Sequence, residues 1–184
     1  MNHHDMTRNM VLAALFAALT AIGAFLQIPT GTVPITLQFL FTALAGLLLG
    51  WKWGAVSQLL YVGIGLLGLP VFTQGGGIGY VLQPSFGFLL GLIPAAAVIG
   101  ALTVRRTGYL TVLAAVLVGD LILYAVGVPY MYLILHVYMQ SAKTFPALLA
   151  AMLVYVPGDT LKIVVVTVLA PVLRRTLAKA VPNL

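Results

Sequence analysis

Cysteine is absent from this chain of 184 residues, and charged side chains are scarce. The lack of cysteine excludes disulfides, thiolate metal sites and a cysteine nucleophile. Only 7% of the residues are charged, against about 25% in soluble domains, so the sequence cannot supply a water-soluble surface. Hydrophobic residues make up 62%, and apolar runs of about 18 residues recur, which is long enough to cross the hydrocarbon layer of a membrane. The composition therefore predicts a polytopic membrane protein.

The apolar runs predict how often the chain crosses the membrane. The first run is too long for a signal-peptide core and no cleavage site follows it, so we expect it to be retained. The runs also lack the alternation of barrel strands, and only helices or closed barrels satisfy their backbone in lipid. We predict an all-α, six-helix bundle forming a single integral membrane domain over residues 1–184, with residues 1–9 as a short, disordered cytoplasmic leader. The expected spans are 10–28, 34–50, 53–69, 85–104, 109–129 and 146–173.

The basic residues predict the orientation of these helices. If the N-terminus is cytoplasmic, seven of the nine lie on the cytoplasmic side, Lys143 faces outward and Lys162 lies inside the last span. This positive-inside bias predicts that both termini are cytoplasmic in a multi-pass protein of the plasma membrane. The basic residues stand singly or in small groups without interleaved aromatics, so nucleic acid is not an expected partner. The seven residues are Arg8, Lys52, Arg105, Arg106, Arg174, Arg175 and Lys179.

A glycine-rich stretch, FTQGGGIGY at 72–80, lies in a predicted outer loop. A phosphate-binding loop follows a strand, opens a helix and carries Lys-Ser or Lys-Thr, and this stretch meets none of these conditions. Its glycines suit a lid that folds against a ligand and moves, with an ordinary flexible connection as the alternative. The polar groups of the outer loops that we expect at the ligand are Gln38, Gly79, Tyr80, Gln83 and Ser85.

Two opposite charges lie in the last predicted span, in the sequence VPGDTLKIVV. Asp159 and Lys162 are three residues apart and therefore share one helical face. Charged residues inside a membrane are costly and normally face a partner, a cavity or a substrate. The pair is either a structural ion pair that fixes helix packing or the polar floor of a pocket for a small polar ring. Pro157 and Gly158 precede the pair and predict a bend in the helix.

Asp120 is the other acidic residue in a predicted span, and Tyr124 lies one helical turn after it. We expect a structural hydrogen bond between the two side chains, with Tyr124 lining a pocket as the alternative. His136 stands in a predicted connection without a second histidine at metal-ligand spacing. We assign it no role and predict neither a metal site nor a catalytic residue.

Small residues repeat along the first predicted helix. One row contains Ala13, Ala17 and Ala21 at a spacing of four, and Ala14 and Ala18 form a second row beside it. Such spacing lets membrane helices approach closely. The rows therefore indicate either packing inside this bundle or a docking face for another membrane protein.

Three separated segments resemble one family of membrane proteins. They are VPITLQ at 33–38, GLPVFTQGGGIGYVLQPSFGFLLG at 68–91 and GDTLK at 158–162, and they resemble the signatures of the BioY family, the biotin-specific substrate-binding (S) components of energy-coupling factor (ECF) transporters. The resemblance runs from the first predicted helix to the last. The family's loop usually continues as Gly-Pro-Thr-Gly-Gly, whereas this chain has Gln-Pro-Ser-Phe-Gly at 83–87.

The resemblance implies a six-helix subunit that captures biotin from outside with high affinity. Its implied partners are a transmembrane coupling (T) subunit and two cytoplasmic ATPases, which alone would bind ATP, so no cofactor is expected in this chain. The alanine rows resemble the coupling motif of such components. Asp159 and Lys162 match biotin-binding positions of the family, where the aspartate would accept from the ureido N–H groups and the lysine would donate either to the ureido carbonyl or to the carboxylate of biotin. Apolar walls are expected from Phe39, Phe41, Tyr80 and Phe86.

Other functions remain open at this point. An S component or a solitary carrier for a different small vitamin would share all features except the family motifs. An intramembrane hydrolase is a more distant alternative, because it would need a serine in a Gly-x-Ser-x context paired with a histidine. Ser85 stands in Gln-Pro-Ser-Phe-Gly, and His136, the only histidine of the membrane region, has no evident partner. A structural scaffold would explain the alanine rows but not the buried charges.

Overall fold

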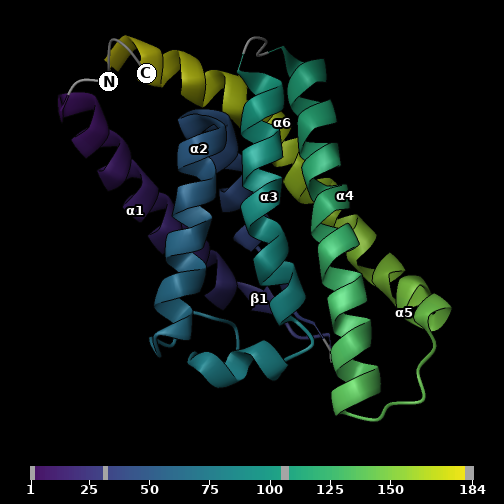
Figure 1. The fold of residues 1–184 in the computed structure, drawn as a ribbon. Coiled ribbons are helices and arrows are strands. Elements are labelled where there is room, and N and C mark those ends of the chain that lie inside the picture. Colours follow the sequence, from purple (N-terminus) through teal and green to yellow (C-terminus); the bar gives the residue numbers. More distant parts are fainter. Residues whose placement is uncertain (1–2, 31–32, 105–107, 181–184) are drawn as a thin grey trace.

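The computed structural model describes residues 3–30, 33–104 and 108–180, and these are mostly helical. Five of its helical stretches are long and apolar enough to cross a membrane, so within the described residues the chain has the form of a polytopic membrane protein (Figure 1). The α-helices are α1 (His3–Phe25), α2 (Gln38–Leu66), α3 (Phe86–Thr103), α4 (Tyr109–Leu133), α5 (Phe145–Ala151) and α6 (Val156–Ala180). The shorter elements are β1 (Gln27–Ile28), β2 (Ile35–Thr36), η1 (Ile78–Leu82), η2 (Ile134–Tyr138) and η3 (Met152–Tyr155).

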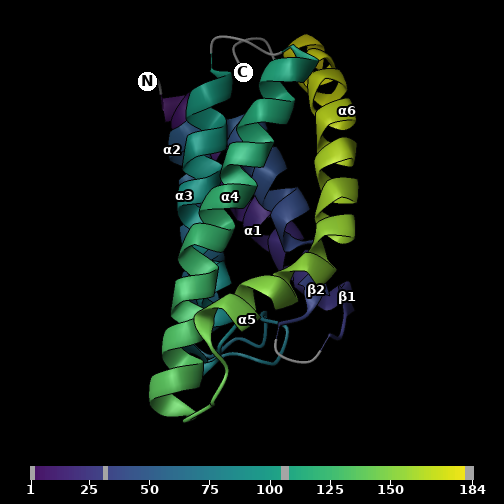
Figure 2. The same cartoon turned by 90° about the vertical axis from the view of Figure 1, so that its right-hand side faces the viewer.

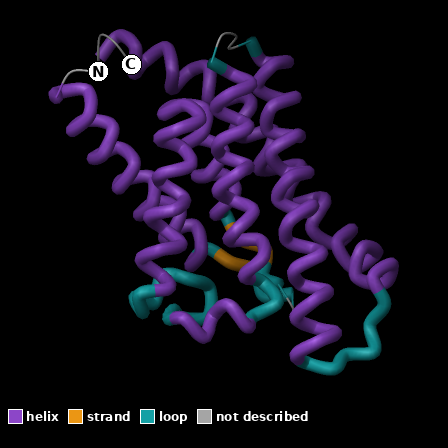
Figure 3. Tube along the Cα trace, in the orientation of Figure 1, coloured by secondary structure: helices purple, strands orange, loops and turns teal. Residues whose placement is uncertain are grey.

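Helices α1 to α4 pack against one another in chain order, and α6 packs against α4 and α2. The start of α1 and the end of α6 lie at the same end of the bundle (Figure 1). The long loops and the small antiparallel β1–β2 sheet gather at the opposite end (Figure 3). Figure 2 shows α5 crossing that end from the side of α4 to the start of α6. We call this end, which holds the candidate site, the loop end.

Helix α2 consists of two segments, 38–49 and 51–66, that fold back on each other at Gly50. Gly50 has φ of 77°, a left-handed conformation that glycine adopts without strain. The two segments touch closely, because a Cβ added to Gly54 would lie 2.8 Å from the Cα of Gly46. Thr42 donates to Gln58 at 3.0 Å across the turn. The predicted spans 34–50 and 53–69 correspond to these two segments.

A buried polar network joins α1 to both segments of α2. The Gln58 side-chain amide donates to Thr20 on α1 at 3.3 Å, and its carbonyl accepts from Thr42. All three side chains are fully buried. Since a polar group in a low-dielectric interior is costly unless it is hydrogen-bonded, this network fixes how α1 and α2 pack together.

Several predicted boundaries are wrong. Helix α1 already begins at His3, so residues 3–9 belong to it and are not a disordered leader. The second span begins at Gln38 rather than 34, because residues 35–36 pair with 27–28 as strands. The predicted span 146–173 is divided into α5, the 3₁₀ segment η3 and α6. The change from η3 to α6 occurs between Tyr155 and Val156, one residue before Pro157, where we predicted a bend.

Candidate functional site

A cavity lies inside the loop end of the bundle, enclosed by α2, α3, α4 and α6 and by the segments before α2 and α3. Its free volume is about 70 Å³. Most of its wall is apolar, and the polar groups are concentrated on α6, on α4 and on the loops. The lining residues are Val33, Pro34, Ile35, Thr36, Gln38, Phe39, Thr73, Tyr80, Ser85, Phe88, Leu89, Leu92, Leu123, Tyr124, Met152, Tyr155, Asp159 and Lys162.

An ion pair forms the polar floor of this cavity. Lys162 Nζ lies 2.5 Å from Asp159 Oδ1, and both side chains are only 9% exposed. The Tyr124 hydroxyl donates to the other oxygen of Asp159, and Lys162 also donates to the Thr36 carbonyl at 3.2 Å. Both carboxylate oxygens therefore already have donors. A ligand in the cavity would meet one anionic acceptor and one cationic donor, both withdrawn from water.

The start of α6 explains how the pair is placed. Pro157 stands in the first turn of α6, where a missing N–H breaks no helical hydrogen bond. Asp159 also lies in this first turn, near the positive end of the helix dipole, which stabilises a carboxylate. One turn later the same face carries Lys162. The local sequence thus places the two charged side chains together at the floor of the cavity.

A strap made of residues 33–36 covers one side of the cavity. The Tyr155 hydroxyl donates to the Val33 carbonyl and lies 3.0 Å from Thr30 Oγ1. The sequence analysis missed Tyr155, although it stands four residues before Asp159 and therefore on the same helical side. It also missed Thr36, whose contribution is a backbone carbonyl that carries no sequence signal.

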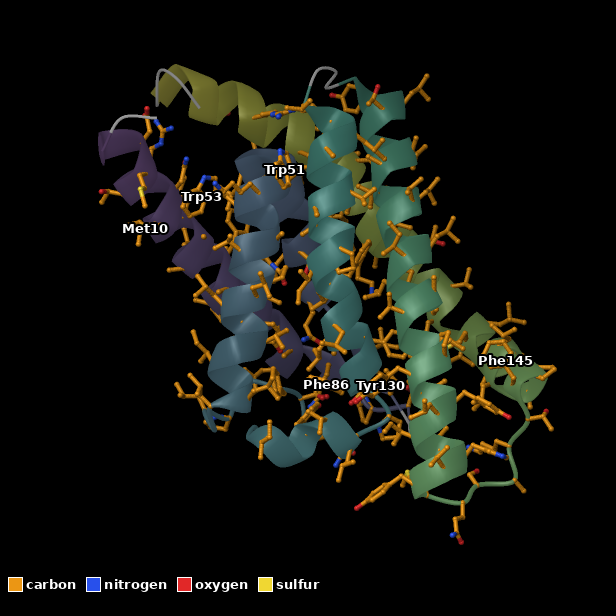
Figure 4. The ribbon with its side chains drawn as sticks, in the orientation of Figure 1. Met10, Trp51, Trp53, Phe86, Tyr130 and Phe145 are labelled. Atoms are coloured by element: carbon orange, nitrogen blue, oxygen red, sulfur yellow. The ribbon has the colours of Figure 1, made fainter. Side chains whose placement is uncertain are left out.

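The glycine-rich loop is packed against the bundle by a row of aromatic rings. Ring centroids are 5.5 Å apart for Tyr61 and Phe72, 4.6 Å for Phe72 and Tyr80, and 6.4 Å for Tyr80 and Phe86. The row ends on α4, where Phe86 meets Tyr130 at 5.8 Å (Figure 4). The loop is therefore an ordered wall of the site, and it presents polar side chains to the cavity. These are Thr73, Tyr80 and Ser85, linked by hydroxyl contacts of 2.9 and 3.4 Å.

The structure brings six of the eight predicted ligand residues to the cavity: Gln38, Tyr80, Ser85, Tyr124, Asp159 and Lys162. Gly79 and Gln83 do not line it, and their role at the ligand stays a prediction. Both are exposed, because η1 turns Tyr80 inward and its neighbours outward. Of the predicted apolar walls, Phe39 and Tyr80 line the cavity, while Phe41 and Phe86 do not.

The predicted hydrogen bond between Asp120 and Tyr124 is wrong. Tyr124 donates to Asp159 across the α4–α6 contact instead. One oxygen of Asp120, Oδ1, is buried and has no hydrogen-bond partner within the described residues. Tyr124 therefore belongs to the cavity wall, which was the alternative interpretation.

The two alanine rows of α1 lie in different surroundings. Ala13 and Ala17 are 0% and 4% exposed inside this chain's own bundle, so the docking prediction is corrected to packing for them. Ala21 is partly buried against the same core. Ala14 and Ala18 are exposed and remain available to another membrane protein.

The residues that a hydrolase would require are not arranged for catalysis. Ser85 Oγ contacts the Tyr80 hydroxyl, and the His136 ring stacks on Tyr132 with centroids 5.3 Å apart. Ser85 and His136 thus have separate partners. The described part of the chain also contains no cluster of side chains that could hold a metal ion.

Comparison with known proteins decides the family. The model of the BioY family matches residues 1–179, nearly the whole chain. The chain belongs to the BioY family. A relative named as a probable biotin transporter BioY from Lysinibacillus sphaericus is 52% identical over 141 residues, which are 76% of this chain and 72% of that protein. The biotin transporter BioY of Thermotoga maritima is 35% identical over 89% of this chain and 94% of its own length.

A solved structure supports the same membership. The crystal structure of the S-component for biotin from an ECF-type ABC transporter superposes with a TM-score of 0.83 at 29% sequence identity. The match covers 95% of each chain. The BioY fold therefore extends over the helices and loops that enclose the cavity.

Proposed function

We propose that this chain captures biotin from outside the cell with high affinity, as the substrate-binding S component of an ECF-type transporter. The buried Asp159–Lys162 pair at the floor of a mostly apolar cavity is the observation that carries this proposal. Biotin's ureido ring offers two N–H donors and a carbonyl acceptor, which match a carboxylate and an ammonium. Its sulfur ring and aliphatic chain suit the apolar wall that includes Phe39, Leu89 and Leu92. The names of the family relatives, all transporters, support transport rather than catalysis.

The topology that fits this function has six spans, with the two segments of α2 counted separately, and both termini in the cytoplasm. The chain would form one integral domain of the plasma membrane, with its first residues on the cytoplasmic side and the cavity opening outward. Arg8, Lys52 and Arg174 support this orientation because they belong to the end of the bundle opposite the loops. Arg105 and Arg106, which we counted on the same side, lie outside the described residues.

The partners in this proposal are a T subunit, which would meet the exposed row of Ala14 and Ala18, and two cytoplasmic ATPases. The small side chains of this row allow a partner helix to approach closely. The chain itself would need no cofactor. Its lipid-facing helices carry large exposed apolar side chains, as Leu110, Leu121 and Leu161 show.

Equilibrium binding of labelled biotin to the purified chain in detergent tests the proposed function, with thiamine and riboflavin as competitors. We expect tight, one-site binding without ATP or partners, which only unlabelled biotin displaces. Displacement by one of the other vitamins would support the alternative of an S component or carrier for that vitamin. A folded chain that binds none of the three would refute the proposal.

A further inference from the structure

Asp120 is a partly buried acidic residue that the ion pair of the site does not use. It lies in the middle of α4, and its Oδ1 atom is buried without a hydrogen-bond partner among the described residues. A charged oxygen without a hydrogen bond is costly inside a membrane, so acidic residues there normally pair with another group. The question is which group could become that partner.

The packing of α4 and α6 places Lys162 at the level of Asp120. The two helices run in opposite directions (Figure 2), and the bond between Tyr124 and Asp159 fixes their register. Asp120 precedes Tyr124 by one turn, and Lys162 follows Asp159 by about one turn. In antiparallel helices both steps lead away from the loop end. Asp120 and Lys162 therefore lie at similar depths in the bundle, one helical turn farther from the loop end than Tyr124 and Asp159.

The electrostatic surroundings agree with this placement. Burial is the largest influence on Asp120 and disfavours its charge; of the charged side chains that act on it, Asp159 repels it and Lys162 attracts it. The Lys162 ammonium has three donors and uses two of them, for Asp159 and for the Thr36 carbonyl. Its four-carbon stem is flexible enough to change partners.

We propose that Asp120 is a second carboxylate partner for Lys162, to which the ammonium moves when ligand N–H groups bind Asp159. This inference rests on the proposed function. Lys162 Nζ and the Tyr124 hydroxyl each donate to one oxygen of Asp159, so ligand N–H groups share these oxygens with them and weaken the bond to the ammonium. An ammonium displaced inside the membrane needs another anion, because an unpaired buried charge is strongly unfavourable. Asp120 supplies that anion at the same depth.

The move also enlarges the site. Lys162 is part of the cavity lining, and the free volume of about 70 Å³ is small for an organic ligand. Typical ligand pockets measure roughly 300–1,000 Å³. A shift of the Lys162 ammonium from Asp159 toward Asp120 would deepen the floor of the cavity, while another of its three donors would remain available to the ureido carbonyl.

Two substitutions separate the charge of Asp120 from its shape. Asp120→Asn keeps the size and hydrogen-bonding capacity but removes the anion, whereas Asp120→Glu keeps the anion and changes the size. We expect the Asp120→Asn variant to bind biotin with a Kd at least tenfold higher than that of the wild type. The Asp120→Glu variant should have a Kd within a few-fold of the wild-type value. Wild-type affinity in the Asn variant, or equal losses in both variants, would overturn the inference.

The stability of the ligand-free protein gives a second readout. Because Asp120 Oδ1 is unpaired in this state, Asp120→Asn should unfold at the same or a higher temperature than wild type while binding biotin less tightly. A merely structural aspartate would lower the unfolding temperature when changed, and this result would contradict the proposal. Failure of wild-type protein to bind biotin would overturn the proposed function, and the ligand-driven move with it. Normal wild-type binding with an unaffected Asn variant would overturn this inference alone.

Discussion

Removing the carboxylate of Asp159 tests whether the buried ion pair binds the ligand or only holds α6 in place. In Asp159→Asn, the ligand loses a charged acceptor, and hydrogen bonds to charged groups contribute about 1.5–3 kcal/mol each. Two such bonds to a ureido ring, taken at the lower limit, amount to about 3 kcal/mol, which corresponds to a rise in Kd of roughly 100-fold. We expect this loss in a titration of labelled biotin.

The same change affects stability, and this effect must be measured separately. Breaking one half of a buried pair costs about 3–5 kcal/mol, because the remaining charge is left uncompensated. Lys162 keeps its bond to the Thr36 carbonyl, so we expect the lower part of this range. Thr160→Ala is the matched control, since the Thr160 side chain is exposed on the same helical turn and bonds only its own helix. It should change neither binding nor stability.

A double variant distinguishes the two interpretations of the pair. Asp159→Asn combined with Lys162→Gln removes both charges, so its stability should recover relative to either single variant. If the pair binds biotin, affinity stays low even though the protein is stable again. A stable double variant that binds biotin as tightly as wild type would refute our reasoning and show that the pair is purely structural.

Three further changes test neighbouring parts of the site. Tyr124→Phe removes one donor to Asp159 and should weaken biotin binding about 5- to 30-fold in the same titration, as 1–2 kcal/mol predicts; unchanged affinity would show that the hydroxyl does not position the carboxylate. Tyr155→Phe releases the strap at Val33 and should speed biotin dissociation in a pulse-chase assay by a similar factor; an unchanged off-rate would contradict a covering role. Ala14→Leu should leave biotin binding to the purified chain intact but impair biotin uptake in cells, because the exposed row of α1 would no longer fit a partner helix. Ala13→Leu, inside the bundle, should instead lower the unfolding temperature. Normal uptake by the Ala14→Leu variant would contradict the docking proposal.

The features that sequence predicts best here are those that the membrane imposes. Long apolar runs must be helical, and so the two segments of α2 and the helices α3 and α4 lie close to their expected ranges. The Asp159–Lys162 pair was also predictable, because three residues along a helix always share a face. Local rules were sufficient in these cases.

The predictions that failed depend on contacts between elements distant in the sequence. Tyr124 bonds Asp159 rather than Asp120, since the packing of α4 on α6 offers a nearer acceptor. The expectation for Ala13 and Ala17 required knowing which face of α1 meets α2, and alanine occurs on both faces. Local spacing restricts which residues can meet, and tertiary packing decides which of them do.

Because the glycine-rich loop is ordered, a different wall of the cavity is expected to move when a ligand enters. The free volume of about 70 Å³ requires some wall to move before an organic molecule enters. The glycine-rich loop is held by its aromatic row and by the bond from Gly77 N–H to the Gly65 carbonyl. The strap at 33–36 is held to η3 by the Tyr155 hydroxyl at Val33, whereas its other end is paired with β1 and bonded by Lys162. Separating Val33 from Tyr155 breaks one hydrogen bond, whereas displacing the glycine-rich loop breaks its aromatic row, so we expect a ligand to enter at the Val33 end of the strap.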